Sequence, residues 1–269
     1  MVAHLNSKRR KMKFFKEHIH SEMKIFLKGS VKVELNISNN DWNDFNNDTS
    51  WFIKPNDKVT LSETFQGKDF FNFSDSFTNL YPVLSKLLIK ARVTNVQVNN
   101  ESYQLLGWSD DEGNSFGWLV KPPAVDINKP LCDEHKILLQ YFGGIRERWN
   151  ETKISWLLNL DSALTLEDAE LGIHQGWENY LADVKKNEGF VSYINPRDYI
   201  AFAFEANGNI TLYHKHNSSI IMLAHDHCFE HITPLDGYPE YTFYRINECP
   251  NFVSWVEEVA KQEIRRIRG

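Results

Sequence analysis

Apolar and polar residues alternate near the beginning of the chain, with the period of a strand that buries one face. The alternating apolar residues are Val31, Val33, Leu35 and Ile37. Residues 59–65 are predicted to form a second strand. Residues 103–108 and 116–120 flank an Asp- and Gly-rich turn and are predicted to form a hairpin. Residues 39–50, rich in Asn and Asp, are expected to form a surface loop.

Apolar residues recur every three or four positions in other segments, as in helices that bury one face. These segments are 80–91, 131–142, 165–186 and 252–264. Gly143-Gly144 is expected to end the second helix, because glycine adopts the left-handed C-terminal conformation without strain. Thr165 with Asp168 resembles a capping box at the start of the third helix. Asn251 is expected to cap the closing helix.

Short apolar runs separated by turn residues follow in the last third of the chain. They predict strands at 199–204, 209–213, 220–224 and 241–246. Helices that enclose an antiparallel meander give the α+β fold class. Pro122-Pro123 disfavours regular structure. It is therefore the predicted boundary between a β-rich N-terminal region with one helix, residues 1–125, and an α+β domain, residues 126–269.

The composition is that of a globular protein that binds neither nucleic acid nor membrane. A net charge of −6 and a pI of about 5.9 disfavour contact with a phosphate backbone. No apolar run reaches the roughly 20 residues that cross a bilayer. The basic run at 7–16 lacks the apolar stretch of a secretory signal. We therefore expect a cytoplasmic protein, with Cys132, Cys228 and Cys249 reduced and mostly buried.

His225, His227 and His231 are the residues most suggestive of chemistry. On a strand, His225 and His227 would share a face, as two ligands of one metal must. A metal-dependent hydrolase that uses this cluster is one alternative. Against it, no second pair of ligands has the spacing of a structural zinc site, which favours ordinary hydrogen-bonding roles and no metal. The sequence also has no nucleophile elbow and no phosphate-binding loop, so we expect no catalysis and no cofactor.

Several motifs in the second half of the chain occur in an order that is similar to one known family. They are Tyr141-Phe142-Gly143-Gly144, Ile200-Ala201-Phe202-Ala203, Asn207-Gly208-Asn209, His225-Asp226 and Phe252-Val253-Ser254-Trp255. Together they resemble the SUKH superfamily, known for fungal cell-wall-synthesis regulators and for bacterial immunity proteins encoded beside secreted toxins. The resemblance covers residues 131–262 and implies an antiparallel sheet with flanking helices, no cofactor, and a surface that binds one protein. The family's usual Leu-Pro pair is replaced by Pro130-Leu131, and residues before 126 lie outside the match.

The resemblance implies a non-catalytic immunity protein that neutralises a cognate toxin, for instance a nuclease, by stoichiometric binding. Trp149 follows Arg148 in a polar segment, which is the composition of interface hot spots. Glu170, Glu178 and Asp183 are expected to face a basic partner and to speed the encounter. An intracellular scaffold or interaction module, like the fungal relatives, is the other alternative. The sequence does not fix the oligomeric state.

Overall fold

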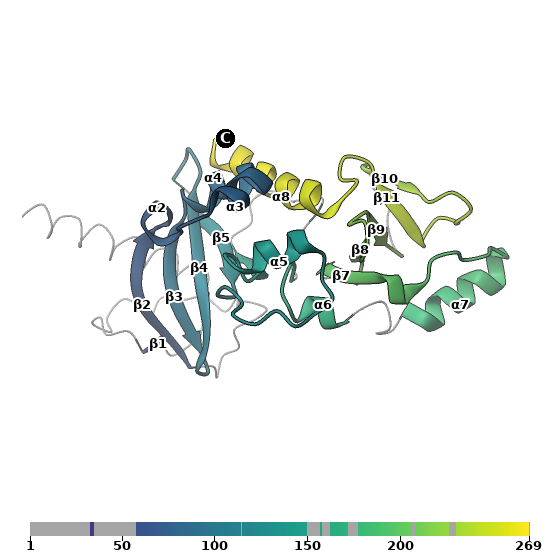
Figure 1. The fold of residues 1–269 in the computed structure, drawn as a ribbon, viewed down its shortest axis with the longest axis horizontal. Helices are drawn as coiled ribbons and strands as arrows, with labels where there is room; N and C mark the ends of the chain where they lie inside the picture. Colours follow the sequence, from purple (N-terminus) through teal and green to yellow (C-terminus); the bar gives the residue numbers. More distant parts are fainter. Residues whose placement is uncertain are drawn as a thin grey trace, which may run out of the picture.

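In the computed structural model, the described residues are 33–34, 58–113, 115–149, 157, 162–171, 177–205, 208–225 and 230–268. They form helices together with largely antiparallel sheet, so the predicted α+β class is confirmed. Figure 1 shows a six-stranded sheet at one end of this part of the molecule and a smaller sheet at the other, with α8 (Phe252–Ile267) beside the first sheet.

The six-stranded sheet has its strands in chain order, β1 to β6. They are β1 (Val33–Glu34), β2 (Val59–Gln66), β3 (Arg92–Val98), β4 (Glu101–Ser109), β5 (Ser115–Val120) and β6 (Ile145–Trp149). β1 and β2 are parallel, and the other pairs are antiparallel. The predicted strand at 59–65 and the β4–β5 hairpin are confirmed, whereas β3 and β6 were not expected. Residues 39–50, and most of the strand expected at 31–37, lie outside the described residues.

The second sheet has five antiparallel strands in the order β10-β11-β9-β8-β7. They are β7 (Tyr199–Phe204), β8 (Ile210–His214), β9 (Ile220–Leu223), β10 (Ile232–Pro234) and β11 (Phe243–Ile246). Four of these strands match the predicted meander, and β10 is an addition. Gly208, in the turn between β7 and β8, has φ +92°, a conformation that glycine adopts without strain.

The two sheets are joined through Ala163. This residue forms antiparallel bridges with Ile145 of β6 on one side and with Ala203 of β7 on the other. The amide of Leu164 donates to the carbonyl of Phe202 at 2.6 Å, and the amide of Ile145 donates to the carbonyl of Ala163 at 2.7 Å. A single extended segment therefore connects the strand ladders of both halves.

The described helices lie before β3, between β5 and β6, between β6 and β7, and after β11. They are α2 (Gly67–Phe70), α3 (Asp75–Leu80), α4 (Pro82–Leu88), α5 (Asp133–Leu139), α6 (Asp168–Leu171), α7 (Trp177–Glu188), the 3-10 helix η2 (Pro196–Asp198) and α8. The helix predicted at 80–91 is present as α4, which is shorter than expected and has Pro82 in its first turn, and α3 is an additional helix before it. Tyr81, which precedes Pro82, has φ −124° and ψ 62°, because a residue before proline is pushed out of the helical region. α3 therefore ends before Tyr81, and α4 begins after it.

Two predicted caps are present. Asn251 and Ser254 form a reciprocal capping box at the start of α8. The Thr165 hydroxyl accepts from the amide of Asp168 at 3.0 Å, and a carboxylate oxygen of Asp168 accepts from the amide of Thr165 at 3.0 Å. Thr165 thus caps α6, α6 and α7 cover the described parts of the helix predicted at 165–186, and residues 172–176 lie outside the described residues.

One hydrophobic core extends through both halves of the chain. It includes Phe77 and Trp118 from the first half, and Phe202 and Trp255 from the second, each at most 1% exposed. The expectation that Trp255 is a core residue is confirmed. The side chain of Trp177, also expected in the core, lies outside the description.

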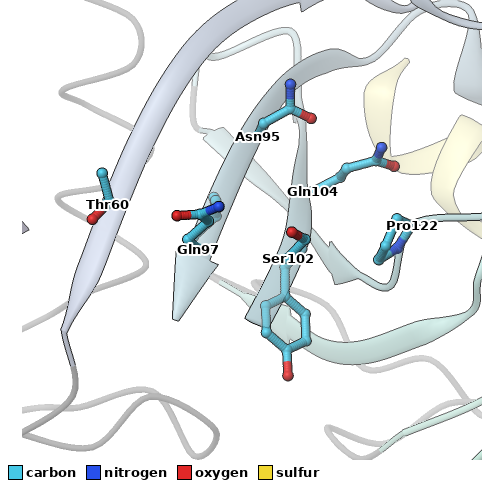
Figure 2. Close-up of a pocket in the computed structure, with 8 residues that line it drawn as sticks. Thr60, Asn95, Gln97, Ser102, Gln104 and Pro122 are labelled. Carbon is cyan, nitrogen blue, oxygen red and sulfur yellow. The ribbon is translucent and has the colours of Figure 1, made fainter. Parts of the chain in front are cut away.

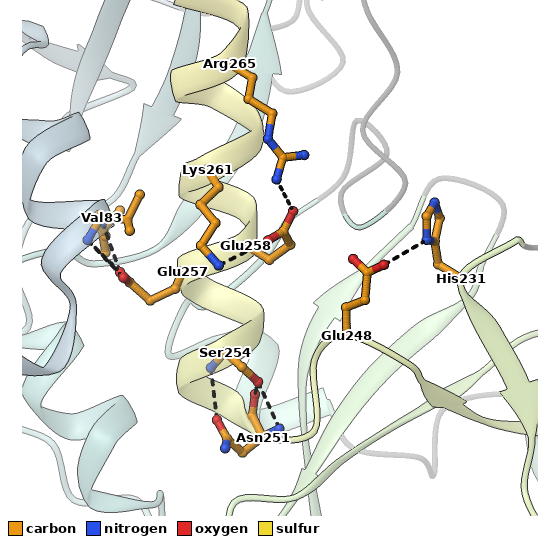
Figure 3. Close-up of polar contacts among 10 residues, drawn as sticks. Val83, His231, Glu248, Asn251, Ser254, Glu257, Glu258, Lys261 and Arg265 are labelled. Atoms are coloured by element: carbon orange, nitrogen blue, oxygen red, sulfur yellow. Dashed lines mark hydrogen bonds and ion pairs between the residues drawn. The ribbon is translucent and has the colours of Figure 1, made fainter.

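The contacts continue across the expected boundary at residue 125. β6 pairs with β5, and a carboxylate of α8 caps the start of α4. Glu257 accepts from the amide of Val83 at 2.9 Å and from the amide of Leu84 at 3.0 Å (Figure 3). These contacts join the two sides of residue 125, and how the chain divides into independently folding units stays a prediction.

Gly143-Gly144 lies where three backbone segments converge. A Cβ atom on Gly143 would be 2.1 Å from the carbonyl oxygen of Pro122, and one on Gly144 would be 2.5 Å from the backbone of Leu164. Gly144 also has φ +91°. The pair therefore does more than follow α5: it lets β5, β6 and the segment at 163–165 approach one another.

Candidate protein-interaction surface

The four residues predicted to bind a partner lie on three different elements. Trp149 is the last residue of β6, Glu170 is in α6, and Glu178 and Asp183 are in α7. The side chains of Trp149, Glu170 and Glu178 lie outside the description. Asp183 is exposed on α7. Of the four, only Asp183 therefore contributes a described side chain to a candidate surface.

The premise behind Trp149 is wrong in one respect. The polar segment that precedes Trp149 is not on the surface, because Arg148 is only 2% exposed and Glu147 only 4%. Nη2 of Arg148 lies 2.6 Å from Oε1 of Glu263 on α8, and Arg266 also contacts Glu263. This buried charge cluster ties β6 to α8, so the charges of this segment belong to the interior.

α7 covers a second, smaller core on the five-stranded sheet. This core contains Leu212, Leu223, Tyr238 and Phe243, and the partly buried Leu181 of α7 packs against it. Outside the core, the Tyr180 hydroxyl of α7 donates to the carbonyl of Tyr241 at 2.7 Å. Helix α7 is therefore fixed to the loop that precedes β11.

The loop after α7 is held by one buried hydroxyl. The Tyr238 hydroxyl accepts from the amides of Tyr193 at 2.9 Å and of Ile194 at 3.0 Å, and lies 2.9 Å from the Ser192 hydroxyl. The ring of Tyr193 meets that of Tyr238 edge-on, with centroids 4.9 Å apart. The Tyr193 hydroxyl donates to the carbonyl of Asp236 at 3.2 Å. The backbone at 192–194 is thereby fixed at several points.

Large apolar side chains of this loop are exposed to solvent, and so is one in the loop that precedes β11. Val191 is 79% exposed, Tyr193 65% and Tyr241 43%. Together with Asp183 we call these residues the α7 surface. Exposed tyrosines on a rigid backbone are typical of binding sites, because a Tyr side chain offers a large contact area and loses little conformational freedom on binding.

The charges around the α7 surface are mixed, with a small acidic excess. Residues 177–198 carry four acidic and three basic side chains, and residues 235–241 add two acidic ones. Partial desolvation, together with the nearby Tyr238 and Asp236, raises the pKa of Tyr193 against the opposing effect of Arg245, so its hydroxyl stays neutral at physiological pH. The surface therefore presents neutral aromatic groups within a weakly acidic rim.

The histidine cluster is only partly described. His225 follows β9, whereas His227 lies outside the described residues. Nδ1 of His231, next to β10, lies 3.7 Å from a carboxylate oxygen of Glu248. Within the described ranges, no three His, Cys, Asp or Glu side chains are grouped so as to hold a metal ion. Whether the full cluster binds a metal stays a prediction.

The described thiols and the core histidine are deeply buried. Burial raises the pKa of Cys132 to about 11 and that of Cys249 to about 12, so both remain protonated. His135 is fully buried, with its ring nitrogens 3.2 Å from the Tyr213 hydroxyl and 3.0 Å from the carbonyl of Leu164. Burial lowers the pKa of His135 to about 4. The expectation of buried, reduced thiols is confirmed for Cys132 and Cys249, and Cys228 lies outside the description.

No family model matches the chain, and neither a curated protein nor a solved structure matches it. Among the described helices, none has both the length and the apolar character needed to cross a bilayer. The fold and the α7 surface define an α+β protein with an exposed, fixed aromatic loop.

Sequence reasoning missed Val191, Tyr193 and Tyr241. A signal was present, because Phe190, Val191 and Tyr193 follow Gly189 in a segment with no helical period and end at Pro196. Apolar residues in a turn-rich segment without periodicity have no regular element through which to be buried. Such residues are candidates for exposed anchors.

Proposed function

We propose that this chain is a non-catalytic immunity protein that acts in the cytoplasm and neutralises a cognate toxin by binding it through the α7 surface. The observation that carries the proposal is the fixed loop with exposed Val191 and Tyr193. A loop already held in one conformation loses little freedom on binding, so more of the contact energy appears as affinity.

The family resemblance supports the choice of partner. Immunity proteins of the SUKH type act by covering one protein, and they need neither a cofactor nor a catalytic group. The buried thiols of Cys132 and Cys249 and the buried His135 fit this mode, because groups closed off from solvent do not meet a substrate. The weakly acidic rim favours a partner with a basic face, such as a nuclease.

The test is co-expression with the product of the gene beside this one, followed by kinetics on the purified pair. We expect rescue of the cells and a complex with one copy of each protein. Tyr193→Ala should raise the dissociation rate by roughly 30-fold, the effect of removing a typical anchor. Asp183→Lys should mainly slow association, and this slowing should shrink as salt rises.

The matched control is Val125→Ala, which removes an apolar side chain that is 95% exposed and lies outside the α7 surface. It should leave both rates unchanged. If the neighbouring product neither poisons cells nor binds, the scaffold alternative is favoured. If Val125→Ala weakens binding as much as Tyr193→Ala, the α7 surface is not the site.

The hydrolase alternative predicts that the purified chain contains a bound metal ion. A metal site at His225, His227 and His231 requires about one transition-metal ion per purified chain, with the ion lost in His227→Ala. Elemental analysis of both proteins decides this point. A stoichiometric metal with that behaviour would replace the immunity proposal by the hydrolase.

A further inference from the structure

A pocket of about 270 Å³ lies on the six-stranded sheet, away from the α7 surface. Six of its lining residues are labelled in Figure 2: Thr60, Asn95, Gln97, Ser102, Gln104 and Pro122. Thr60 is on β2, two of the amides are on β3, and Ser102 and Gln104 are on β4. Apart from Pro122, these side chains carry neutral hydroxyl or carboxamide groups.

Strand register places these polar side chains on the same face of the sheet as the core. Val93 pairs with Leu106, both of them core residues, and the next pair on that face is Asn95 with Gln104. Gln97 pairs with Ser102 and with Thr60. Apolar rows thus change to polar rows along β3 and β4, and the polar rows line the pocket.

Gln104 is the residue that points to a ligand. Its side chain is 8% exposed and lines the pocket, and within the described part of the chain no hydrogen bond to its carboxamide is found. The amide atoms of Gln104 are not among the buried polar atoms that lack a partner in the described part of the chain, so they are open to the pocket, where hydroxyl groups of a bound molecule can replace water. The amide group opens onto the pocket beside Pro122 (Figure 2).

The charged side chain of Lys121, close to the pocket, is already paired and does not make the pocket a site for a charged ligand. Nζ of Lys121 lies 3.1 Å from a carboxylate oxygen of Glu167, 3.5 Å from one of Glu101, and 4.8 Å from the ring centroid of Tyr103. Its charge is therefore already balanced by two carboxylates. It lines an adjoining hollow of about 350 Å³, which shares Ser102 and Pro122 with the pocket.

We propose that this polar pocket binds a small neutral polyhydroxy compound of about monosaccharide size. Carboxamide and hydroxyl groups both donate and accept, as the hydroxyls of such a compound do. The pocket volume of about 270 Å³ is roughly nine times the volume of about 30 Å³ that one water molecule occupies in the liquid. This is room for a compound of about monosaccharide size. An extended peptide fits less well, because β3 and β4 are interior strands and offer no free edge for backbone pairing.

The test is titration of the ¹⁵N-labelled full chain with glucose, galactose and inositol, followed by amide shifts in NMR spectra. Glucose 6-phosphate, glucosamine and N-methylacetamide serve as the anionic, cationic and peptide-like comparisons. We expect at least one neutral polyol to give saturable shifts centred on residues 95–104, and the three comparisons to bind more weakly. Gln104→Leu should weaken binding by about tenfold, the effect of one lost hydrogen bond.

Two further variants make the result decisive. Gln97→Ala changes an exposed side chain, so it should leave the fold intact and still weaken binding at least about threefold. Gln140→Leu repeats the Gln104 change at an exposed site outside the pocket and should bind like the unmodified chain. The proposal is overturned if no neutral polyol saturates the shifts, if a comparison compound binds more tightly, or if both pocket variants bind normally.

Discussion

The cap that α8 supplies to α4 offers the sharpest test of how the two halves depend on each other. α4 has no capping side chain at its own N-terminus, where Tyr81 precedes Pro82. The amides of Val83 and Leu84 instead donate to Glu257 of α8. We predict that Glu257→Ala lowers the free energy of unfolding by about 2–3 kcal/mol, since a buried amide left without an acceptor costs about 1–3 kcal/mol.

The acceptor oxygens of Glu257, rather than its charge, should supply the stability. Burial raises the pKa of Glu257, although the hydrogen bonds from the amides of Leu84 and Val83 lower it. The cost of desolvating the carboxylate therefore exceeds the stabilisation that its negative charge receives from these hydrogen bonds. Gln keeps one acceptor oxygen in the same place. Glu257→Gln is therefore expected to cost at most about 1 kcal/mol, well below the effect of Glu257→Ala.

The adjacent residue provides the control. Glu258 pairs with Lys261 and Arg265, whose side chains are 49% and 67% exposed (Figure 3). The side chain of Glu258 is itself only 9% exposed, but within the described residues no backbone amide donates to it, so Glu258→Ala leaves no amide without an acceptor and should cost about 1 kcal/mol, less than Glu257→Ala. Urea unfolding followed by circular dichroism and tryptophan fluorescence measures all three variants. A Glu257→Ala protein within about 0.5 kcal/mol of the unmodified chain would refute the reasoning.

Three further predictions concern the interior. The first concerns His135: between pH about 6.5 and pH about 4, the free energy of unfolding measured by urea titration should fall by up to about 3 kcal/mol. The reason is that the unfolded chain binds a proton at His135 at a higher pH than the folded chain does. Burial raises the pKa of Asp168 to about 6, so protonation of Asp168 stabilises the fold as the pH falls and opposes the effect of His135. The quantity to measure is therefore the difference in unfolding free energy between the unmodified chain and His135→Gln at each pH. Parallel pH curves for the two proteins would contradict the prediction. Glu263→Gln should cost about 3–5 kcal/mol in the same assay, since Arg148 and Arg266 stay buried; a loss under about 1 kcal/mol would refute this. Gly143→Ala should lower the melting temperature far more than Gly113→Ala, whose added Cβ meets no atom within 4 Å and costs only the strain of φ +85°; equal shifts would contradict it.

Elements with a strong local signal could be predicted from the sequence. The β4–β5 hairpin has its turn residues, and α8 has both its cap and a regular apolar stripe. β6 could not be predicted in the same way, because its Arg148 reads as a surface residue. Only the buried contact with Glu263, 115 residues further on, makes that charge compatible with the interior.

The candidate site was less predictable than the fold. Asp183 was named from charge on a helix, which is a local property. The exposure of Val191 and Tyr193 depends on the Tyr238 hydroxyl, 45 residues along the chain from Tyr193. The polar pocket likewise depends on register between strands, which the sequence does not fix where both faces of a sheet are buried.

The cap between Glu257 and Val83 also sets an order of events during synthesis. The two residues are 174 positions apart. At 5–20 residues per second, a ribosome makes Glu257 about 9–35 s after Val83. During that interval α4 and the apolar face beneath it have no α8 to cover them, so the nascent chain passes through a period in which chaperones can bind it. Variants that weaken α8 should therefore lower the yield of folded protein in cells more than their effect on the finished molecule suggests.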